Sequence, residues 1–311
     1  MHPSGSSHAW LTWAFSPSVS AIALTLLVAL LLPLLIHTYL YRTRSSTTLP
    51  TFLLVGPSGA GKTSLLTLAD VDKLANGRPS PTHTTQTPFT AACTLASSTT
   101  ASSSRYRSSN DPSAQHRPKF QITDTPGHGK LRHYALSPLT APPTSVIRGL
   151  IFVLDAAAIS PDSDDGGGGS APRGGTGNLT ETAEFLHDVL LLLQKRRTAS
   201  TTSKGPRKIP VLVAANKMDL FTALPAPLVK KRLEAEIGRV RVTRAKGLLD
   251  SGVGMEDDLG GEERERLGEG GEGAFEFAQM EECGVEVVVE GGCVKGDADV
   301  ERWWEWIGEQ L

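Results

Sequence analysis

The chain of 311 residues has little cysteine, little net charge and few aromatic side chains. Its three cysteines, Cys93, Cys283 and Cys293, form neither a metal-type spacing nor a disulfide framework, which favours reduced thiols in a cytosolic compartment. A formal net charge of −2 provides no basic excess for phosphate backbones, so we expect no direct nucleic-acid partner. Aromatic residues make up 6% of the chain, whereas glycine, proline, serine and threonine are abundant. Part of the chain therefore belongs to insertions outside the core.

Charge is absent altogether from residues 19–36, an apolar run that residues 37–41 extend. About 20 apolar residues in a helix span a hydrocarbon core of about 30 Å, so we expect a single transmembrane helix over residues 18–41. A cleaved signal peptide is the competing interpretation, but no Lys or Arg precedes the run and no small-residue cleavage site follows it. A buried core helix of this length would be less uniformly apolar.

The nearest basic residues predict the orientation of this helix. Arg42 and Arg44 follow the run, whereas residues 1–17 carry no Lys or Arg. The positive-inside rule then places the C-terminal side in the cytosol and leaves residues 1–17 as a short lumenal tail. Residues 42–50 remain as a short linker to the next segment.

A glycine-rich loop follows the first apolar strand of the next segment. Residues 56–63 fit G-x-x-x-x-G-K-[ST], the phosphate-binding loop, and a helical pattern begins directly behind them. Glycines let successive backbone N–H groups turn toward phosphate oxygens, and the helix adds the positive end of its dipole. A chance glycine-rich turn is the alternative, but it would not require the strand before and the helix after. The expected nucleotide-binding residues here are Gly56, Pro57, Ser58, Gly59, Ala60, Gly61, Lys62, Thr63 and Ser64.

Two loops are expected to neutralise the phosphate charge and to bind Mg²⁺. Lys62 should reach the β- and γ-phosphates and serve catalysis there, and the Thr63 hydroxyl should bind Mg²⁺. The strand at 119–123 leads into Asp124 and Gly127, which fit D-x-x-G. Asp124 should hold Mg²⁺ through water, and the Gly127 N–H should approach the γ-phosphate, so that loss of this phosphate would release the loop as a switch. D-x-x-G also occurs in ordinary turns, but its position after a phosphate loop strengthens the prediction.

The base is expected to be read by a third loop. Residues 216–219 fit N-K-x-D after the apolar strand at 209–215. The Asp219 carboxylate offers two acceptors to guanine N1–H and N2–H₂, a donor pair that adenine lacks, so the motif selects GTP and GDP. Asn216 would bridge to the phosphate loop, and the Lys217 stem would lie along the base. A helix cap at Asp219 is the alternative.

A fourth loop is less specific in sequence. Cys293, Val294 and Lys295 follow the strand at 285–289. Their backbone N–H groups would meet guanine O6, and Lys295 would cover the ring. An ordinary surface loop accounts for the same residues equally well.

Strands and helices alternate from residue 51 to residue 311. Near-continuous apolar strands predict an α/β fold with a mostly parallel sheet covered by helices on both faces, in which ligands bind at the carboxyl ends of the strands. We expect strands at 51–55, 91–95, 119–123, 149–154, 209–215 and 285–289, and helices at 62–74, 181–197, 228–240 and 300–311. Biased composition predicts flexible insertions at 97–118, 160–179 and 250–273.

The three motifs and the leading apolar helix together resemble the β subunits of the eukaryotic signal recognition particle receptor. Further similar stretches are residues 124–132, 152–157, 184–186, 239–244 and 275–277. The resemblance implies a Ras-like P-loop GTPase domain, residues 51–311, held by its transmembrane helix on the cytosolic face of the endoplasmic reticulum. In its GTP form it would bind the receptor's α subunit, and through it the signal recognition particle, the ribosome and the translocon. One departure is the fourth loop, where the family usually has Ser-Ala-Lys and this chain has Cys-Val-Lys.

The resemblance also suggests how Mg²⁺ and the attacking water would be held. A threonine of the first switch should complete the Mg²⁺ shell; Thr85 and Thr87 are the candidates, and we prefer Thr87. His128 stands where Ras-like proteins carry the glutamine that orients water, so it is either catalytic or an interface residue. Because no arginine finger is identifiable, we expect slow turnover.

Three interpretations of function remain open on the sequence. The first is a GTPase switch, and the second is a membrane docking scaffold that keeps GTP and hydrolyses little. The third is another Arf-like membrane GTPase in vesicle traffic. Such proteins usually attach through an amphipathic or acylated N-terminus, and myristoylation would need glycine where this chain has His2.

Overall fold

The chain divides into two compact units, Met1–Thr48 and Leu49–Leu311. The computed structural model describes residues 19–44, 49–69, 82–95, 118–140, 147–159, 179–198, 208–250, 267–268, 273–295 and 299–311. The expected lumenal tail at 1–17 lies outside the described residues. So do most of the three expected insertions, at 97–118, 160–179 and 250–273.

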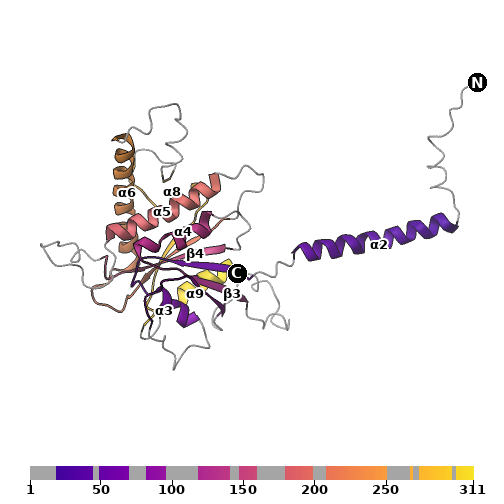
Figure 1. Ribbon diagram of the computed structural model, residues 1–311, viewed down its shortest axis with the longest axis horizontal. Helices are drawn as coiled ribbons and strands as arrows, with labels where there is room; N and C mark the ends of the chain where they lie inside the picture. Colours follow the sequence, from indigo (N-terminus) through magenta and orange to yellow (C-terminus); the bar gives the residue numbers. More distant parts are fainter. Residues whose placement is uncertain are drawn as a thin grey trace, which may run out of the picture. The chain divides into compact units, whose positions relative to one another are not determined.

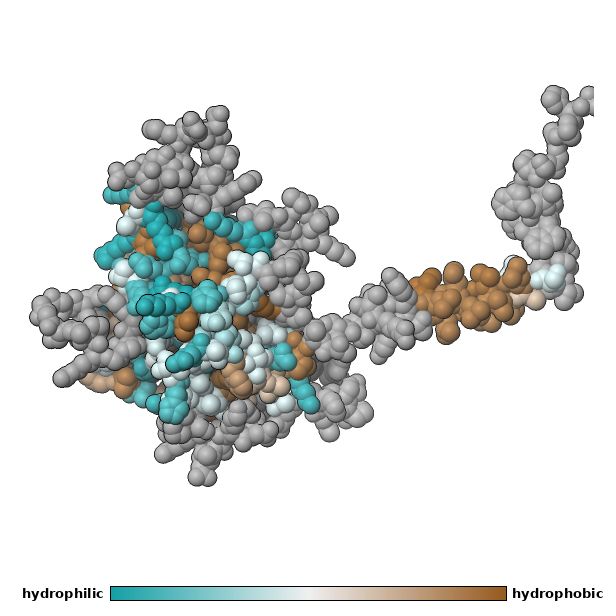
Figure 2. Space-filling view, viewed as in Figure 1, coloured by the Kyte–Doolittle hydropathy of each residue, from teal (hydrophilic) through white to brown (hydrophobic). Residues whose placement is uncertain are grey.

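The described part of the first unit, residues 19–44, is one helix. Helix α2 spans Val19–Arg44 and includes Pro33. Its described side chains give an almost unbroken hydrophobic surface (Figure 2). Residues 19–41 of the predicted helix are therefore helical, and residue 18 lies outside the described residues. Among the described residues, however, no helix is both long enough and apolar enough to cross a membrane.

The second unit is built on a six-stranded sheet in the order β2-β3-β1-β4-β5-β6. Every neighbouring pair is parallel except β2 and β3, which are antiparallel. The predicted mostly parallel sheet is confirmed. In chain order the strands are β1 (Thr51–Val55), β2 (Phe89–Thr94), β3 (Lys119–Asp124), β4 (Ile147–Asp155), β5 (Val211–Asn216) and β6 (Val287–Gly291).

Helices cover both faces of this sheet (Figure 1). One face carries α3 (Lys62–Ala69) and α9 (Glu301–Gln310); the other carries α4 (His133–Thr140), α5 (Leu179–Thr198), α6 (Ala226–Asp250) and the short α8 (Gln279–Glu282). Each face has its own apolar core. On the first, Phe52 packs edge-on against Phe120 and Trp306; on the second, Phe152 packs against Phe185. Burying a large apolar side chain contributes about 1.5–3 kcal/mol, so these two cores fix the sheet and its strand ends.

Register brings the carboxyl ends of four parallel strands to one edge. Leu54 of β1 pairs with Asp124 of β3, and Asp155 of β4 pairs with Asn216 of β5. Three of these strands, β1, β3 and β5, lead into the loops that the sequence marks as nucleotide-binding. The antiparallel strand β2 delivers its preceding loop to the same edge, because Phe89 at its start pairs with Asp124.

Three helices differ from the sequence-based expectation, and the shortest of them, α8, was not expected at all. Helix α4 was not expected, since its eight residues include Pro138 and follow a glycine-containing turn that continues into a 3₁₀ turn, Gly129–Leu131. Helix α6 runs ten residues beyond the predicted 228–240. Its polar extension is held by Arg241, which donates to the carbonyls of Leu267 and Gly273, and by Arg244, which pairs with Asp188 of α5.

Candidate functional site

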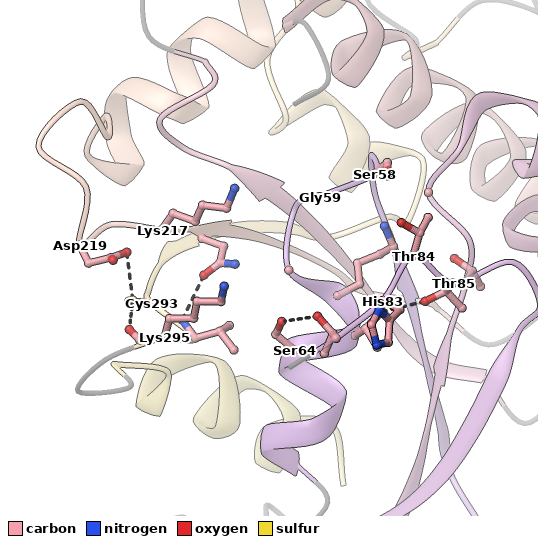
Figure 3. A pocket seen from close by; sticks show the side chains of 18 of the residues that line it. Ser58, Gly59, Ser64, His83, Thr84, Thr85, Lys217, Asp219, Cys293 and Lys295 are labelled. Carbon is pink, nitrogen blue, oxygen red and sulfur yellow. Dashed lines mark hydrogen bonds between the residues drawn. The ribbon is translucent and has the colours of Figure 1, made fainter. Parts of the chain in front are cut away.

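Loops at the carboxyl edge of the sheet surround a cleft of about 440 Å³ (Figure 3). Thirteen of the sequence-predicted residues line it: Ser58, Gly59, Gly61, Lys62, Thr63, Ser64, Gly127, Asn216, Lys217, Asp219, Cys293, Val294 and Lys295. Residues of the first switch segment, Thr82 to Thr85, also line it. The structure thus brings together loops that are more than 200 residues apart in the chain.

The phosphate loop wraps around its own lysine. Lys62 lies at the start of α3, and its Nζ donates to the carbonyl oxygens of Gly56 and Pro57 at 2.8 and 2.7 Å. Burial lowers the pKa of Lys62 to about 8, although the nearby Asp124 carboxylate raises it. A buried ammonium that donates to neutral carbonyls, with one carboxylate nearby, suits an anionic ligand such as a phosphate group.

Oxygen ligands for a metal gather next to this lysine. Asp124 Oδ2 accepts hydrogen bonds from the Thr63 and Thr85 hydroxyls, at 2.6 and 3.1 Å. Asp124 Oδ1 is buried and has no hydrogen-bond partner among the described residues. Burial raises the pKa of Asp124, against the lowering effect of the Thr63 hydroxyl and of the Lys62 charge. A buried carboxylate oxygen left open, beside two hydroxyls, fits the all-oxygen coordination that Mg²⁺ prefers.

The threonine that lies beside the other candidate Mg²⁺ ligands is not the one that we preferred on the sequence. Thr85, not Thr87, contacts a candidate Mg²⁺ ligand, since its hydroxyl lies 2.8 Å from the Thr63 hydroxyl. Thr87 is exposed, and it is not among the described residues that line the cleft. The reason is the path of the loop: Thr87 lies two residues before β2, where the chain has already turned into the edge strand.

Gly127 is pressed against the phosphate loop. A Cβ atom at this position would lie 2.4 Å from Lys62 Nζ and 2.6 Å from the Ser58 backbone nitrogen. Only glycine therefore lets the β3 loop approach so closely.

His128 follows Gly127 in the chain, but its side chain points to solvent instead of packing against the phosphate loop. Its side chain is exposed, caps the following 3₁₀ turn and accepts the Lys130 N–H at Nδ1, at 3.3 Å. It is not among the described residues that line the cleft.

The other end of the cleft is a network of side chains (Figure 3). Asn216 donates to the Ala60 carbonyl at 2.7 Å and accepts the Val294 N–H at 3.1 Å, so it ties the third loop to the first and fourth loops. The Cys293 thiol lies within hydrogen-bonding distance of two acceptors, Asp219 Oδ1 at 3.1 Å and the Lys295 carbonyl oxygen at 2.5 Å, and its single proton is shared between them. Burial raises the pKa of this thiol, and the adjacent Asp219 adds to the effect, so the protonated donor form is favoured.

Two further polar residues of this edge were given no role on the sequence. Thr125 donates its hydroxyl to the Leu54 carbonyl at 2.6 Å and lines the cleft. Asp155 ends β4 and accepts a hydrogen bond from Lys217 Nζ. The signal for Asp155 is its place directly after an apolar strand, as for Asp124, but no second motif residue accompanies it.

Comparison with known proteins gives a consistent result. A family model described as "Signal recognition particle receptor beta subunit" matches residues 47–166 and 174–285. The signal recognition particle receptor subunit beta of Saccharomyces cerevisiae is 32% identical over 262 residues, covering 84% of this chain and 84% of that protein. The Mus musculus subunit is 27% identical over 301 residues, covering 94% of this chain and 87% of that protein.

Solved structures agree with this result. The Chaetomium thermophilum receptor protein SRb-GDP has a TM-score of 0.57 and 39% identity, covering 85% of this chain and all of that chain. The SRb-GTP/SRX complex from the same organism has a TM-score of 0.56 and 38% identity, covering 84% of this chain and 98% of that chain. An SRb-GDP-Mg structure, with a TM-score of 0.58 and 38% identity, covers 85% of this chain and 98% of that one.

Proposed function

The chain belongs to the signal recognition particle receptor beta subunit family, and from that premise we propose that it is the GTP-binding subunit of such a receptor. The observation that carries the proposal is that a phosphate loop and a guanine-type loop line one cleft, and that an open buried carboxylate, Asp124, accepts the hydroxyl of the cleft residue Thr63. The GDP, GTP and Mg²⁺ named with the solved relatives support the same ligands here. Family membership argues against the Arf-like vesicle-traffic alternative.

At the phosphate end, this chain's residues would bind and neutralise charge. The backbone N–H groups of residues 56–63 would cradle the phosphates, with Lys62 shared between the β- and γ-phosphates. Thr63, Thr85 and Asp124 would hold Mg²⁺, which supplies further neutralisation of phosphate charge when bound. Gly127 would present its N–H to the γ-phosphate, because the β3 loop already touches the phosphate loop there.

At the base end, the residues would select guanine. Asp219 would accept from N1–H and N2–H₂, which an adenine ring lacks, while Asn216 fixes the loop that carries it. Val294 and Lys295 would cover the O6 edge and the ring face. The Cys293 thiol would orient the Asp219 carboxylate, and it stands where the family usually has a serine hydroxyl.

Hydrolysis would be slow on this geometry. GTP hydrolysis is an in-line attack of water that depends on positioning and charge neutralisation. Lys62 supplies charge, but His128, the residue expected to orient the attacking water, is not among the described residues that line the cleft. This observation favours a GTP-loaded docking scaffold over a fast switch. Single-turnover hydrolysis, measured with and without the α subunit, separates the two: a large acceleration by the partner would favour the switch.

We also propose single-pass anchoring in the endoplasmic reticulum membrane by the α2 segment, with residues 1–17 lumenal and residues 42–50 as linker. Support comes from the uncharged run at 19–36, the basic residues that follow it, and the family. Removal of residues 1–44 should give a soluble fragment that still binds GTP, because the second unit has its own core. Sedimentation of that fragment with liposomes, as tightly as the full chain, would contradict the anchor.

The proposed partner is the α subunit of the receptor, with indirect links to the signal recognition particle, the ribosome and the translocon. The complex of the relative named SRb-GTP/SRX supports a nucleotide-loaded partner complex. The test uses the full chain in liposomes, loaded with a non-hydrolysable GTP analogue or with GDP. We expect the α subunit to be retained in the GTP-analogue state only. Equal retention in both states, or none, would overturn the proposed recruitment.

A further inference from the structure

A buried carboxylate lies beside the base end of the cleft. Asp155 is the last residue of β4, pairs in register with Asn216 and is 7% exposed. Its Oδ2 accepts a hydrogen bond from Lys217 Nζ at 2.5 Å. Its Oδ1 accepts the backbone N–H groups of Ala157 and Ala158 at 3.0 and 3.4 Å. The carboxylate therefore joins the turn after β4 to the loop after β5.

Lys217 is held in an unusual backbone conformation. Its φ is +66°, and among the described residues it is the one non-glycine residue with a positive φ. A residue with a side chain keeps this left-handed conformation only where its surroundings fix it. The surroundings here are the ion pair with Asp155 and the turn in which Leu220 N–H donates to the Lys217 carbonyl at 3.0 Å. That turn carries Asp219.

Lys217 has a second carboxylate close by in the chain. Asp219 lies two residues later and lines the same end of the cleft (Figure 3). Opposite charges attract strongly in a partly buried cleft, so an ammonium released from Asp155 would compete with a purine for Asp219. Pairing with Asp155 removes this competition and leaves the methylene stem of Lys217 as the cleft wall.

We propose that Asp155 is a positioning residue for guanine recognition: it holds the Lys217 ammonium and thereby keeps the Asp219 carboxylate available to the base. The inference rests on the proposed function, because it concerns how the same cleft would recognise a guanine nucleotide. Asp155 does not itself line the cleft, so it acts through Lys217.

The test measures release of a fluorescent GDP analogue from the full chain in detergent micelles, chased with excess unlabelled GDP. Asp155→Asn keeps an oxygen acceptor for the turn N–H groups but loses the charge that holds Lys217. Release should become about tenfold faster, in line with the loss of one partner of a charge pair that is buried only on the Asp155 side. Asp188→Asn is the matched control, because it breaks the ion pair with Arg244 between α5 and α6, outside the cleft; its release rate should be that of the unchanged chain.

A double-substitution cycle separates this role from a structural one. Lys217→Met removes the ammonium and keeps an unbranched stem. In that background Asp155→Asn should add less than about a twofold change in release, because the group through which it acts is gone. A carboxylate that merely stabilised the turn would accelerate release by the same factor in both backgrounds.

Each outcome decides between these possibilities. Equal release from Asp155→Asn and the unchanged chain, or equal factors in both backgrounds, overturns the inference and leaves the proposed function standing. Failure of the unchanged chain to bind any guanine nucleotide overturns both. If circular dichroism shows that Asp155→Asn does not fold, Asp155→Ser takes its place with the same expectation, because its hydroxyl can still accept from the turn.

Discussion

The two ends of the cleft are built in different ways. At the phosphate end, Lys62 is held by backbone carbonyls, and Asp124 keeps one buried oxygen without a partner among the described residues. At the base end, Asn216, Asp219 and Lys217 are already bonded to neighbouring groups. The first end is arranged to gain contacts when a ligand binds, and the second is arranged in advance.

This difference separates affinity from selectivity. A buried ammonium and a buried carboxylate with few partners cost free energy, which a phosphate and a divalent cation would offset. A preformed set of acceptors gains less on binding but rejects a base that leaves its polar groups unpaired. Substitutions at the phosphate end should therefore weaken all nucleotides, whereas those at the base end should change which nucleotide is bound.

The largest effect is expected from Lys62→Met. Loss of the buried ammonium should weaken GTP and GDP alike by about 100-fold or more, since a charge-assisted contact to phosphate disappears. Isothermal titration calorimetry of the full chain in detergent measures this. The control is Lys230→Met, whose ammonium lies 4.0 Å from Glu234 on α6 and should leave affinity unchanged. Equal affinities for the Lys62 variant and the unchanged chain would contradict the assigned role.

Asp219→Asn should change selectivity instead. GTP affinity should fall by about tenfold or more, because the amide offers one acceptor where guanine needs two. Xanthosine nucleotides should bind better than to the unchanged chain, since their second oxygen accepts from the Asn amide. Competition against a labelled nucleotide measures both. A parallel loss of guanine and xanthine nucleotides would mean that Asp219 only supports the loop.

The two first-switch threonines form a matched pair. Thr85→Ala removes a hydroxyl 2.8 Å from that of Thr63, so about tenfold more Mg²⁺ should be needed for half-maximal nucleotide retention. Thr87→Ala, two residues away and exposed, should leave the Mg²⁺ requirement unchanged. A titration of nucleotide release against free Mg²⁺ compares them. The reverse result would restore Thr87 as the metal candidate.

The smallest effect is expected at Cys293. Cys293→Ala removes the donor to Asp219, and a weak thiol hydrogen bond should cost about two- to fivefold in GDP retention. Cys293→Ser keeps a donor and should retain GDP at least as well as the unchanged chain. The fluorescent GDP release assay measures both. Identical release from the alanine and serine variants would show that this contact does not orient Asp219.

The sequence predicts the phosphate end of the cleft more completely than the base end, for a physical reason. The phosphate loop is contiguous in sequence, so the motif at residues 56–63 predicts both the path of its backbone and the ligand that it binds. The pairing of Asp155 with Lys217 joins groups 62 positions apart, and only the register of β4 with β5 brings them together. Similarly, the choice between Thr85 and Thr87 depends on the path of the chain before β2. The sequence of this threonine-rich segment does not predict that path.

The fold shows the same contrast. Strands such as β1 and β4 have continuous apolar runs, at 52–55 and 149–154, so their place in a covered parallel sheet follows from composition. Helix α4 contains Pro138, which argues against a helix locally, and tertiary packing of Ala135 and Leu139 in the core overrides it. The end of α6 depends on Arg244 reaching Asp188, a contact that periodicity along one helix cannot reveal.

The central claim is that one cleft binds a triphosphate and selects guanine. The most direct measurement is competition for the full chain, loaded with fluorescent GDP, between GTP and ATP in the presence of Mg²⁺. We predict displacement by GTP at concentrations at least about 100-fold below those needed for ATP, given the paired acceptors of Asp219. Displacement by both at equal concentration would contradict the claim.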